Sequence, residues 1–283
     1  MKDIGLVPNW HKKNTAIVVD KIRHFFEQRN IKIKIADRTK TDFYSDVSLA
    51  EQLSSWHGRL ELIIVVGGDG TILRVARDLA CWNVPVLGIN LGQKGFLAEI
   101  EVEQTERYLQ YIATKQYSFR ERMMLEARLL RGDEELGRYC ALNDIVVARG
   151  PFSRIIKIDA DVNNDFMESY SGDGVIIATP TGSTGYSLSA GGPIVNPTME
   201  LFVVTPICPH SLYNRSVILN GSDTMKLHVD SRQVQVVLTV DGQVRFALED
   251  KDQIIVTRAD QKVRLVCFHD NSFYRLLHQK LKG

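Results

Sequence analysis

The chain has 283 residues, of which 44% are hydrophobic and 24% charged, and its formal net charge is +1. These values are ordinary for a globular protein, and the length favours two domains over one. The balanced charge gives no general attraction to nucleic acid or to membranes, and we expect neither as a partner. No apolar run approaches the roughly 20 residues of a membrane span. The first residues lack the apolar segment of a signal peptide, so we expect a cytoplasmic location.

The cysteines and histidines show no spacing typical of a metal site or of a redox pair. The four cysteines, at positions 81, 140, 208 and 267, are far apart and form no C-x-x-C motif. The seven histidines include no H-x-x-x-H pair. We therefore expect buried free thiols and no metal ion held by side chains of the protein itself.

The beginning of the chain alternates strand and helix patterns. Residues 3–7 form an apolar run, residues 14–28 have helical apolar spacing with Asn14 as the expected cap, and residues 31–36 alternate Ile with Lys. This order predicts a βαβ opening. A polar stretch at residues 37–48 and a short helical segment at residues 49–56 follow.

Residues 62–73 read L-I-I-V-V-G-G-D-G-T-I-L. The apolar run predicts a strand buried on both faces of a parallel sheet, and the spacing from residue 71 to residue 80 predicts an amphipathic helix. Between them, Gly67, Gly68 and Gly70 are expected to adopt φ values that other residues avoid and to let a ligand approach the main chain. With Thr71 they form a candidate phosphate cradle, and Asp69 lies within it.

Asp69 has two interpretations. Aspartate is a common helix N-cap, and glycine-rich turns often follow strands, so a purely structural role is possible. Alternatively, a carboxylate beside free backbone N–H groups suits phosphoryl transfer, in which a base orients the attacking hydroxyl and accepts its proton. The motif G-G-D-G-T resembles the signature shared by NAD kinases, diacylglycerol kinases and sphingosine kinases and, with Ser for Thr, by phosphofructokinases.

A second strand and loop follow the same arrangement. Residues 84–90 predict another buried strand, which runs into a glycine-rich loop at residues 91–95. Carboxyl ends of parallel strands meet at one edge of a sheet, so this loop is a second candidate wall of the site, although taken in isolation it is better explained as a plain turn. Residues 103–114 predict a helix that closes the α/β part near residue 118.

The remainder of the chain is rich in short strands separated by turn residues. Strands are expected at residues 124–130, 139–148, 155–162, 174–179, 225–229, 234–240 and 253–257, and a helix at residues 268–281. This predicts an α/β plus all-β fold: a Rossmann-like α/β domain at residues 1–118, joined by the tail 258–283, and a β-sandwich-like domain at residues 119–257.

Two polar motifs lie in the β-rich part. Asn143 and Asp144 stand together at a strand start, where they suit either a nucleoside or a simple Asx turn. Residues 171–193 read S-G-D-G-V-I-I-A-T-P-T-G-S-T-G-Y-S-L-S-A-G-G-P, which supplies a carboxylate, hydroxyls and the ring of Tyr186. The stretch contains no Lys or Arg, so it favours a sugar or base over a triphosphate.

These motifs together resemble the bacterial NAD kinase family over nearly the whole chain, including P-I-C-P-H-S-L at residues 206–212 and D-G-Q at residues 241–243. The resemblance implies an α/β domain with an all-β domain. It also implies transfer of the γ-phosphoryl of ATP, or in some members of polyphosphate, to the 2′-hydroxyl of the adenosine ribose of NAD. Mg²⁺ would accompany ATP, and the chain would form dimers or tetramers with a shared site.

The resemblance makes Asp69 the general base. It assigns dinucleotide contacts to Asp69, Gly70, Arg74, Asn143, Asp144, Arg154, Asp173, Thr184, Gly185, Tyr186, Ser187, Leu188, Ser189 and Gln243. Ser171, Gly185 and Lys94 depart from residues common in the family.

Two other classes remain open at the level of sequence. A lipid kinase of the diacylglycerol type shares G-G-D-G-T, but the polar stretch 172–192 does not suit an apolar acceptor. A dehydrogenase would require G-x-G-x-x-G after a strand, which is absent. A non-catalytic NAD sensor would have no need of the acid at position 69.

Overall fold

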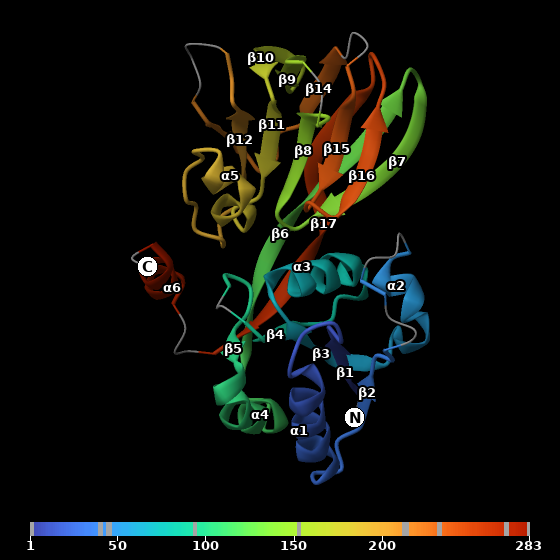
Figure 1. Cartoon of the computed structure of the whole chain (residues 1–283), viewed down its shortest axis with the longest axis vertical. Coiled ribbons are helices and arrows are strands. Elements are labelled where there is room, and N and C mark those ends of the chain that lie inside the picture. The colour runs from blue at the N-terminus through green and yellow to red at the C-terminus, as the bar shows by residue number, and fades with distance from the viewer. Residues whose placement is uncertain are drawn as a thin grey trace. The chain divides into compact units, whose positions relative to one another are not determined.

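The computed structural model describes residues 3–38, 42–43, 47–92, 95–151, 154–210, 215–230, 234–268 and 272–281. Lys94 and parts of the polar stretch 37–48 and of the motif 206–212 lie outside these residues. The chain divides into two compact units, Met1–Glu121 with Val263–Gly283, and Arg122–Lys262 (Figure 1). Both changes of unit fall inside long strands, β6 (Ser118–Arg131) and β17 (Gln253–Cys267). The domain boundaries expected at residues 118 and 257 stay a prediction.

The first unit alternates strands and helices. Its elements are β1 (Asp3–Pro8), α1 (Thr15–Glu27), β2 (Ile33–Ile35), α2 (Leu49–Gln52), β3 (Leu60–Gly67), α3 (Asp69–Asp78), β4 (Val86–Asn90), β5 (Ile100–Glu101), α4 (Thr105–Ala113) and α6 (Phe273–Leu281), with 3₁₀ turns at Ser54–Trp56, Ala80–Trp82 and Val102–Gln104. Helices α1 and α4 lie on one face of the sheet and α3 on the other (Figure 1).

The sheet of the first unit is parallel, in the order β2-β1-β3-β4. The strand order reverses between β1 and β3, and ligands of such sheets bind at the carboxyl ends of the strands at this switch point. The carboxyl ends concerned are those of β1 at Pro8 and of β3 at Gly67. The glycine turn expected from the sequence therefore lies at the position that this topology favours for a ligand.

The second unit consists almost entirely of strands. Besides the parts of β6 and β17 that it contains, it has β7 (Glu134–Ala141), β8 (Asp144–Arg149), β9 (Ile156–Val162), β10 (Asp165–Gly172), β11 (Gly174–Ala178), β12 (Leu201–Ile207), β13 (Val217–Asn220), β14 (Met225–Asp230), β15 (Val236–Val240) and β16 (Val244–Leu248). Its helical turns are a 3₁₀ turn at Gly182–Thr184 and α5 (Tyr186–Ser189).

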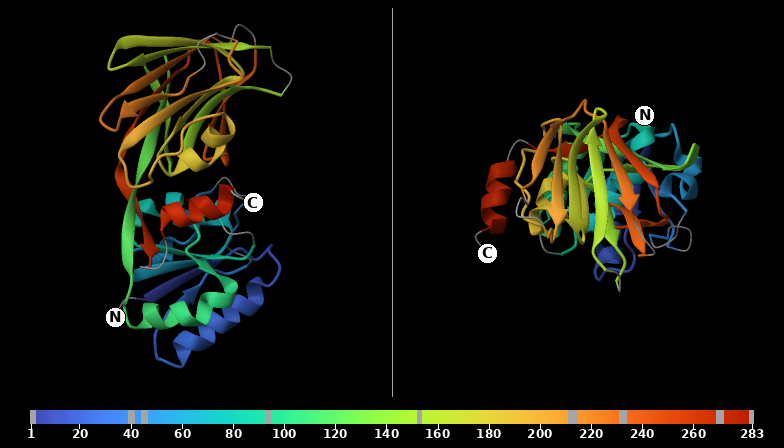
Figure 2. Two further views of the ribbon diagram at one scale, coloured as in Figure 1. Left: turned by 90° about the vertical axis from the view of Figure 1, so that its left-hand side faces the viewer. Right: turned by 90° about the horizontal axis from the view of Figure 1, so that it is seen from above.

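These strands form two layers that enclose one core (Figure 2). One layer has the order β13-β12-β11-β8-β15-β16, and the other contains β10, β9, β14, β17, β6 and β7. The core between them takes buried side chains from both layers, for example Val147 of β8, Phe202 of β12 and Leu227 of β14. The α/β plus all-β fold class is confirmed, and the burial pattern explains it, since inward side chains alternate along strands such as β14.

The structure corrects several local expectations. Residues 139–148 do not form one strand, because β7 ends at Ala141 and β8 begins at Asp144. The backbone N–H groups of Leu142 and Asn143 donate to the carboxylate of Asp241 and are unavailable to a neighbouring strand. Strands β10, β12, β13 and β16 were not expected. Two of these, β10 and β13, expose much of their surface and carry little apolar signal.

Asn14 occupies the N-cap position of α1 but does not cap it with its side chain. Its φ and ψ are 66° and 0°, in the left-handed region that Asn tolerates better than most residues. No helix in the described ranges combines the length and the apolar character that a membrane span requires.

Candidate active site

Asp69 is the first residue of α3, directly after the end of β3. The N-cap residue Gly68 has φ −115° and ψ −178°, an extended conformation that any residue adopts. Neither Gly67 nor Gly70 has a positive φ. The expectation that these glycines supply unusual φ values is therefore wrong.

Space, not backbone conformation, requires glycine at position 67, where a Cβ atom would lie 2.6 Å from the Cβ of Thr71. A Cβ atom on Gly68 would meet only the end of the flexible Lys12 side chain, with Nζ at 2.6 Å, and one on Gly70 would meet no atom within 4 Å. The Thr71 side chain is itself buried, and its Oγ1 accepts a hydrogen bond of 2.9 Å from Asn9 Nδ2. Thr71 and Asn9 thus tie the start of α3 to the end of β1, a role that the sequence did not indicate for Asn9.

The carboxylate of Asp69 is held by the loop that follows β4. The backbone N–H of Phe96 donates to Oδ2 at 2.6 Å, and the N–H of Leu97 donates to Oδ1 at 3.3 Å. A Cβ atom on Gly95 would lie 1.7 Å from Asp69 Oδ1. The glycine at position 95 is therefore a condition for this placement of Asp69, and the second loop does border the acid as a wall.

Arg74 lies one turn further along α3, where its side chain is buried in the first unit. Its guanidinium donates to the backbone carbonyls of Phe43 and Val47 and forms an ion pair with Asp78, with Nε 3.4 Å from Oδ2. The same Asp78 oxygen accepts the N–H of Leu49 at 3.0 Å. These contacts secure the segment before α2, and the nucleotide contact expected for Arg74 stays a prediction.

The second unit contains a cavity of about 750 Å³. Asn143, Asp144 and Tyr186, all expected in the dinucleotide site, line it. Strands β8, β15 and β16 supply the rest of its wall, including Arg149 and Asp241. A cavity of this size and mixed polarity suits a nucleoside or a nicotinamide group.

Asp241 organises the Asn143–Asp144 pair. Its carboxylate accepts three backbone N–H groups, from Leu142 at 3.1 Å, Asn143 at 2.7 Å and Asp144 at 3.1 Å. Asp144 is 6% exposed, and burial together with the nearby charge of Asp241 raises the pKa of its carboxyl to about 7. Sequence reasoning treated Asp241 only as part of a family motif, because its partners lie almost a hundred residues away.

Asp173 forms an ion pair with Arg149. Arg149 Nε donates to Oδ1 at 2.6 Å and its Nη2 to Oδ2 at 3.4 Å, and these bonds lower the pKa of the Asp173 carboxyl. The polar stretch 171–193 contains no cation, but the fold brings one to it from β8. Arg149 could not be found from the motif itself.

The loop at residues 182–189 is divided between surface and interior. Gly185 lies near Asn143 and Asp144, since a Cβ atom on it would be 3.8 Å from Asn143 Nδ2 and 4.0 Å from Asp144 Oδ2. Tyr186 is 47% exposed. The hydroxyl of Ser187, in contrast, is buried and lies 3.0 Å from Thr205 Oγ1, where it serves the interior of the unit.

The other expected residues lie outside the lining of this cavity. Thr184 donates its hydroxyl to the carbonyl of Thr181 at 3.3 Å, Leu188 is partly buried, and Ser189, Gln243 and Arg154 are exposed. Their ligand contacts stay predictions. Within the described ranges, no three His, Cys, Asp or Glu side chains gather closely enough to hold a metal ion.

Comparison with known proteins identifies a family for both parts of the chain. Residues 4–117 match the ATP-NAD kinase N-terminal domain, and residues 142–268 match the ATP-NAD kinase C-terminal domain. An NAD kinase of Natranaerobius thermophilus is 42% identical over 283 residues, which cover 100% of this chain and 99% of that protein. One from Trichlorobacter lovleyi is 40% identical over 285 residues, with 100% and 99% covered.

Solved structures show the same fold. Yeast NADH kinase complexed with NADH superposes with a TM-score of 0.86 at 26% identity, covering 100% of this chain and 88% of that one. An NAD kinase from Archaeoglobus fulgidus in complex with ATP has a TM-score of 0.75 at 24% identity, covering 99% and 98%. With relatives at about 40% identity over its full length, the chain belongs to the NAD kinase family.

Proposed function

We infer that the chain phosphorylates NAD to NADP with ATP as the phosphoryl donor. The observation that carries this is an acid at the start of α3, in a glycine turn at the switch point of a parallel sheet, in a chain of the NAD kinase family. Family membership removes the lipid kinase as an alternative, and the acid distinguishes an enzyme from a sensor that only binds NAD.

In the proposed reaction, the oxygen of the adenosine 2′-hydroxyl bonds to the γ-phosphorus, and the bond from that phosphorus to the β,γ-bridging oxygen breaks. ADP leaves, and the hydroxyl proton passes to Asp69. The transition state of phosphoryl transfer is loose, so Asp69 chiefly orients the hydroxyl and takes the proton late. Phe96 and Leu97 fix the carboxylate for this role through their N–H groups.

The main chain of Gly67, Gly68, Gly70 and Thr71 is proposed to face the phosphates. The N-terminus of α3 attracts anions, and the absent side chains permit close approach. Mg²⁺ bound to ATP would offset phosphate charge during transfer.

The second unit is proposed to bind the dinucleotide at its cavity. Asn143 Oδ1 is buried, and no donor reaches it within the described residues, so a ligand N–H or hydroxyl would satisfy it. Tyr186 offers an exposed ring for stacking, and Asp144 and Asp173 offer carboxyl groups to ribose hydroxyls. The remaining proposed contacts are Arg74, Arg154, Thr184, Gly185, Ser187, Leu188, Ser189 and Gln243. Self-association to a dimer or tetramer is proposed from the family alone.

The first test is NADP formation from NAD, ATP and Mg²⁺ by the purified chain and by Asp69→Asn. Loss of a catalytic base typically lowers the rate by about 10²- to 10⁴-fold. The variant should still bind NAD, measured by equilibrium dialysis, since the acceptor cavity is unchanged. Asp20→Asn, at an exposed position of α1, is the matched control and should keep the wild-type rate. Wild-type turnover by Asp69→Asn would contradict the assignment of the base.

A further inference from the structure

The acceptor proposed for the cavity of the second unit carries two phosphate charges, and these favour a site that contains a cation. Asp144 and Asp241 line the cavity with carboxyl groups. The cations that line it within the described residues are Arg149, at the end of β8, and Arg245, on β16. Arg245 is exposed, so its charge is screened by solvent, and Arg149 is the better placed of the two to hold an anion.

Arg149 is fixed in place by both its backbone and its side chain. Its N–H donates to the carbonyl of Asp173 at 2.9 Å, where β8 pairs with the start of β11. Its guanidinium donates to the Asp173 carboxylate, with Nε 2.6 Å from Oδ1, and its side chain stays 32% exposed. An arginine held in one conformation loses less entropy when it binds a ligand, because its planar fork is already oriented.

The ring of Tyr186 lies near the carboxylates of both Asp173 and Asp144. Burial raises the pKa of the Tyr186 hydroxyl, and the nearby charges of Asp173 and Asp144 raise it further. Tyr186 and Asp144 line the cavity together with Arg149. The guanidinium therefore lies among the residues that are expected to contact the nucleoside, and the pyrophosphate is attached to that nucleoside.

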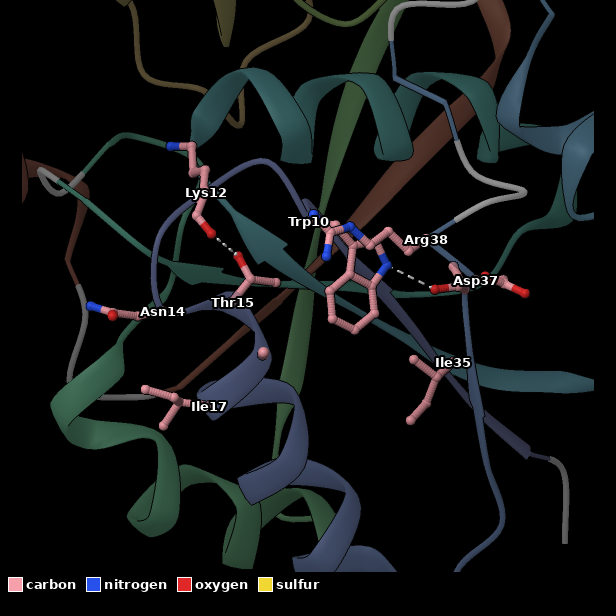
Figure 3. Close-up of a pocket in the computed structure, with 10 residues that line it drawn as sticks. Trp10, Lys12, Asn14, Thr15, Ile17, Ile35, Asp37 and Arg38 are labelled. Atoms are coloured by element: carbon pink, nitrogen blue, oxygen red, sulfur yellow. Dashed lines mark hydrogen bonds between the residues drawn. The ribbon is translucent and has the colours of Figure 1, made fainter.

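The first unit contains a second cationic cavity, of 640 Å³, which is the rival location for the pyrophosphate. Lys12 and Arg38 line it, from the segments that follow β1 and β2 (Figure 3). Its described lining includes no residue that is expected to contact the dinucleotide. The cavity of the second unit contains three such residues together with Arg149, and this favours Arg149 as the partner of the pyrophosphate.

We propose that Arg149 binds the pyrophosphate of the acceptor and thereby selects a dinucleotide over a free nucleoside that has the same 2′-hydroxyl. Its N–H groups match the phosphate oxygens, and such charge-assisted bonds are roughly twice as strong as neutral ones. Asp173 positions the guanidinium, and its remaining lone pairs still accept a ribose hydroxyl. The role of Arg149 rests on the proposed function and deepens it, because Arg149 would determine acceptor specificity.

Binding of ADP-ribose and of adenosine to the full chain, measured by titration calorimetry, tests this role without turnover. ADP-ribose contains the pyrophosphate, whereas adenosine contains only the nucleoside. Arg149→Gln should raise the Kd for ADP-ribose about 10- to 100-fold and keep the Kd for adenosine within about twofold, since hydrogen bonds to charged groups are among the stronger ones. An unchanged Kd for ADP-ribose, an equal rise for both ligands, or no binding of ADP-ribose by the wild type would overturn the role.

Arg128→Gln is the matched control, because Arg128 forms an ion pair of similar exposure with Glu135, on strands that do not line the cavity. Its Kd for ADP-ribose should equal that of the wild type. Arg149→Lys keeps the charge without the planar fork and should recover part of the lost affinity.

A double variant, Arg149→Gln with Asp173→Asn, separates the lost contact from a new repulsion. It removes both charges and should bind ADP-ribose no better than Arg149→Gln. Recovery of binding in the double variant would overturn the contact, because the loss would then come from repulsion by the unpaired carboxylate of Asp173.

Lys12→Gln tests the cavity of the first unit in the same assay and should leave the Kd for ADP-ribose unchanged. A loss of affinity confined to Lys12→Gln would overturn the role of Arg149 and place the pyrophosphate in the first unit.

Turnover separates this role from the proposed function. At saturating ATP, Arg149→Gln should raise the KM for NAD about 10-fold and change kcat little. A chain that makes no NADP but shows the expected pattern with ADP-ribose would contradict only the proposed function. A chain that makes NADP, with Arg149→Gln at the wild-type Kd and KM, would contradict only the role of Arg149.

Discussion

Asp144 shows how the surroundings of one side chain set its chemistry. The carboxyl is 6% exposed and faces the charge of Asp241, so its pKa rises to about 7 from an ordinary value near 3.8. Near neutral pH the Asp144 carboxyl therefore changes from a protonated group that can donate a hydrogen bond to a charged group that only accepts. It lies at the edge of the proposed dinucleotide cavity. Asp241 itself accepts hydrogen bonds from three backbone N–H groups.

Asp144→Asn tests this through stability. Between pH 4 and pH 7 the folded chain retains a proton that the unfolded chain releases, so this residue lowers the free energy of unfolding as pH rises through that window. The variant cannot ionise, and its stability relative to wild type should increase from pH 4 to pH 8 by at most about 4 kcal/mol. Urea unfolding at several pH values measures it.

The control for that measurement is Asp165→Asn, at an exposed position of β10. Its stability relative to wild type should show little change over the same pH range. A stability difference of Asp144→Asn that is the same at pH 4 and pH 8 would mean that the carboxyl is not protonated in the folded chain.

At the scale of elements, the loop after β4 positions the acid at the start of α3. Gly95→Ala should force the loop away from Asp69, because a Cβ atom would lie 1.7 Å from Oδ1. A displacement of about 1 Å at a reacting group can lower the rate by about 10²-fold, so kcat should fall while the KM for NAD changes little. The assay for NADP formation measures both constants.

Gly92→Ala lies in the same loop and is the control. A Cβ atom there meets no atom within 4 Å, and the residue has no positive φ. Thermal unfolding of both variants would show whether any loss of rate reflects the acid or the stability of the loop. A Gly95→Ala variant with wild-type kcat would show that Asp69 acts without the support of this loop.

At the scale of the whole molecule, the chain has a separate hydrophobic core in each unit. The core of the second unit lies between the layers of strands, and that of the first unit packs α1 and α4 on the sheet. All three tryptophans, at positions 10, 56 and 82, belong to the first unit. Tryptophan fluorescence therefore reports on the first unit, whereas far-ultraviolet circular dichroism reports on both.

Asp252→Ala should destabilise the second unit selectively. Asp252 is fully buried there and accepts from Arg131 Nε at 2.8 Å and Nη2 at 2.9 Å. The Asp252 side chain is 0% exposed and that of Arg131 is 39% exposed, so the pair is partly buried, and breaking it should lower the free energy of unfolding of the second unit. The urea midpoint from circular dichroism should fall more than the midpoint from fluorescence. Equal shifts by both probes would show that the two cores unfold as one.

Local sequence patterns were sufficient to predict many strands and helices of this protein. The buried run before Gly67 predicted β3, the helical spacing after it predicted α3, and the alternating β-rich segments predicted the second layered domain, because such signals depend on neighbours in sequence. The motifs around Asp69, Asn143 and Asp173 were sufficient to indicate the family. The conformation of the glycine turn was predicted less well, since glycine at position 67 is required by the proximity of Thr71 and not by its own φ value.

Tertiary structure alone decided which distant groups meet. It placed the N–H groups of Phe96 and Leu97 on Asp69, and Arg149 on Asp173. It also brought Lys12 to the glycine turn. Each of these contacts joins the ends of different strands or the loops after them. Hydrophobic periodicity along the chain carries no information about contacts between residues so distant in sequence. The sequence by itself therefore determined the elements and the acid, and the packing of the elements decided what surrounds that acid.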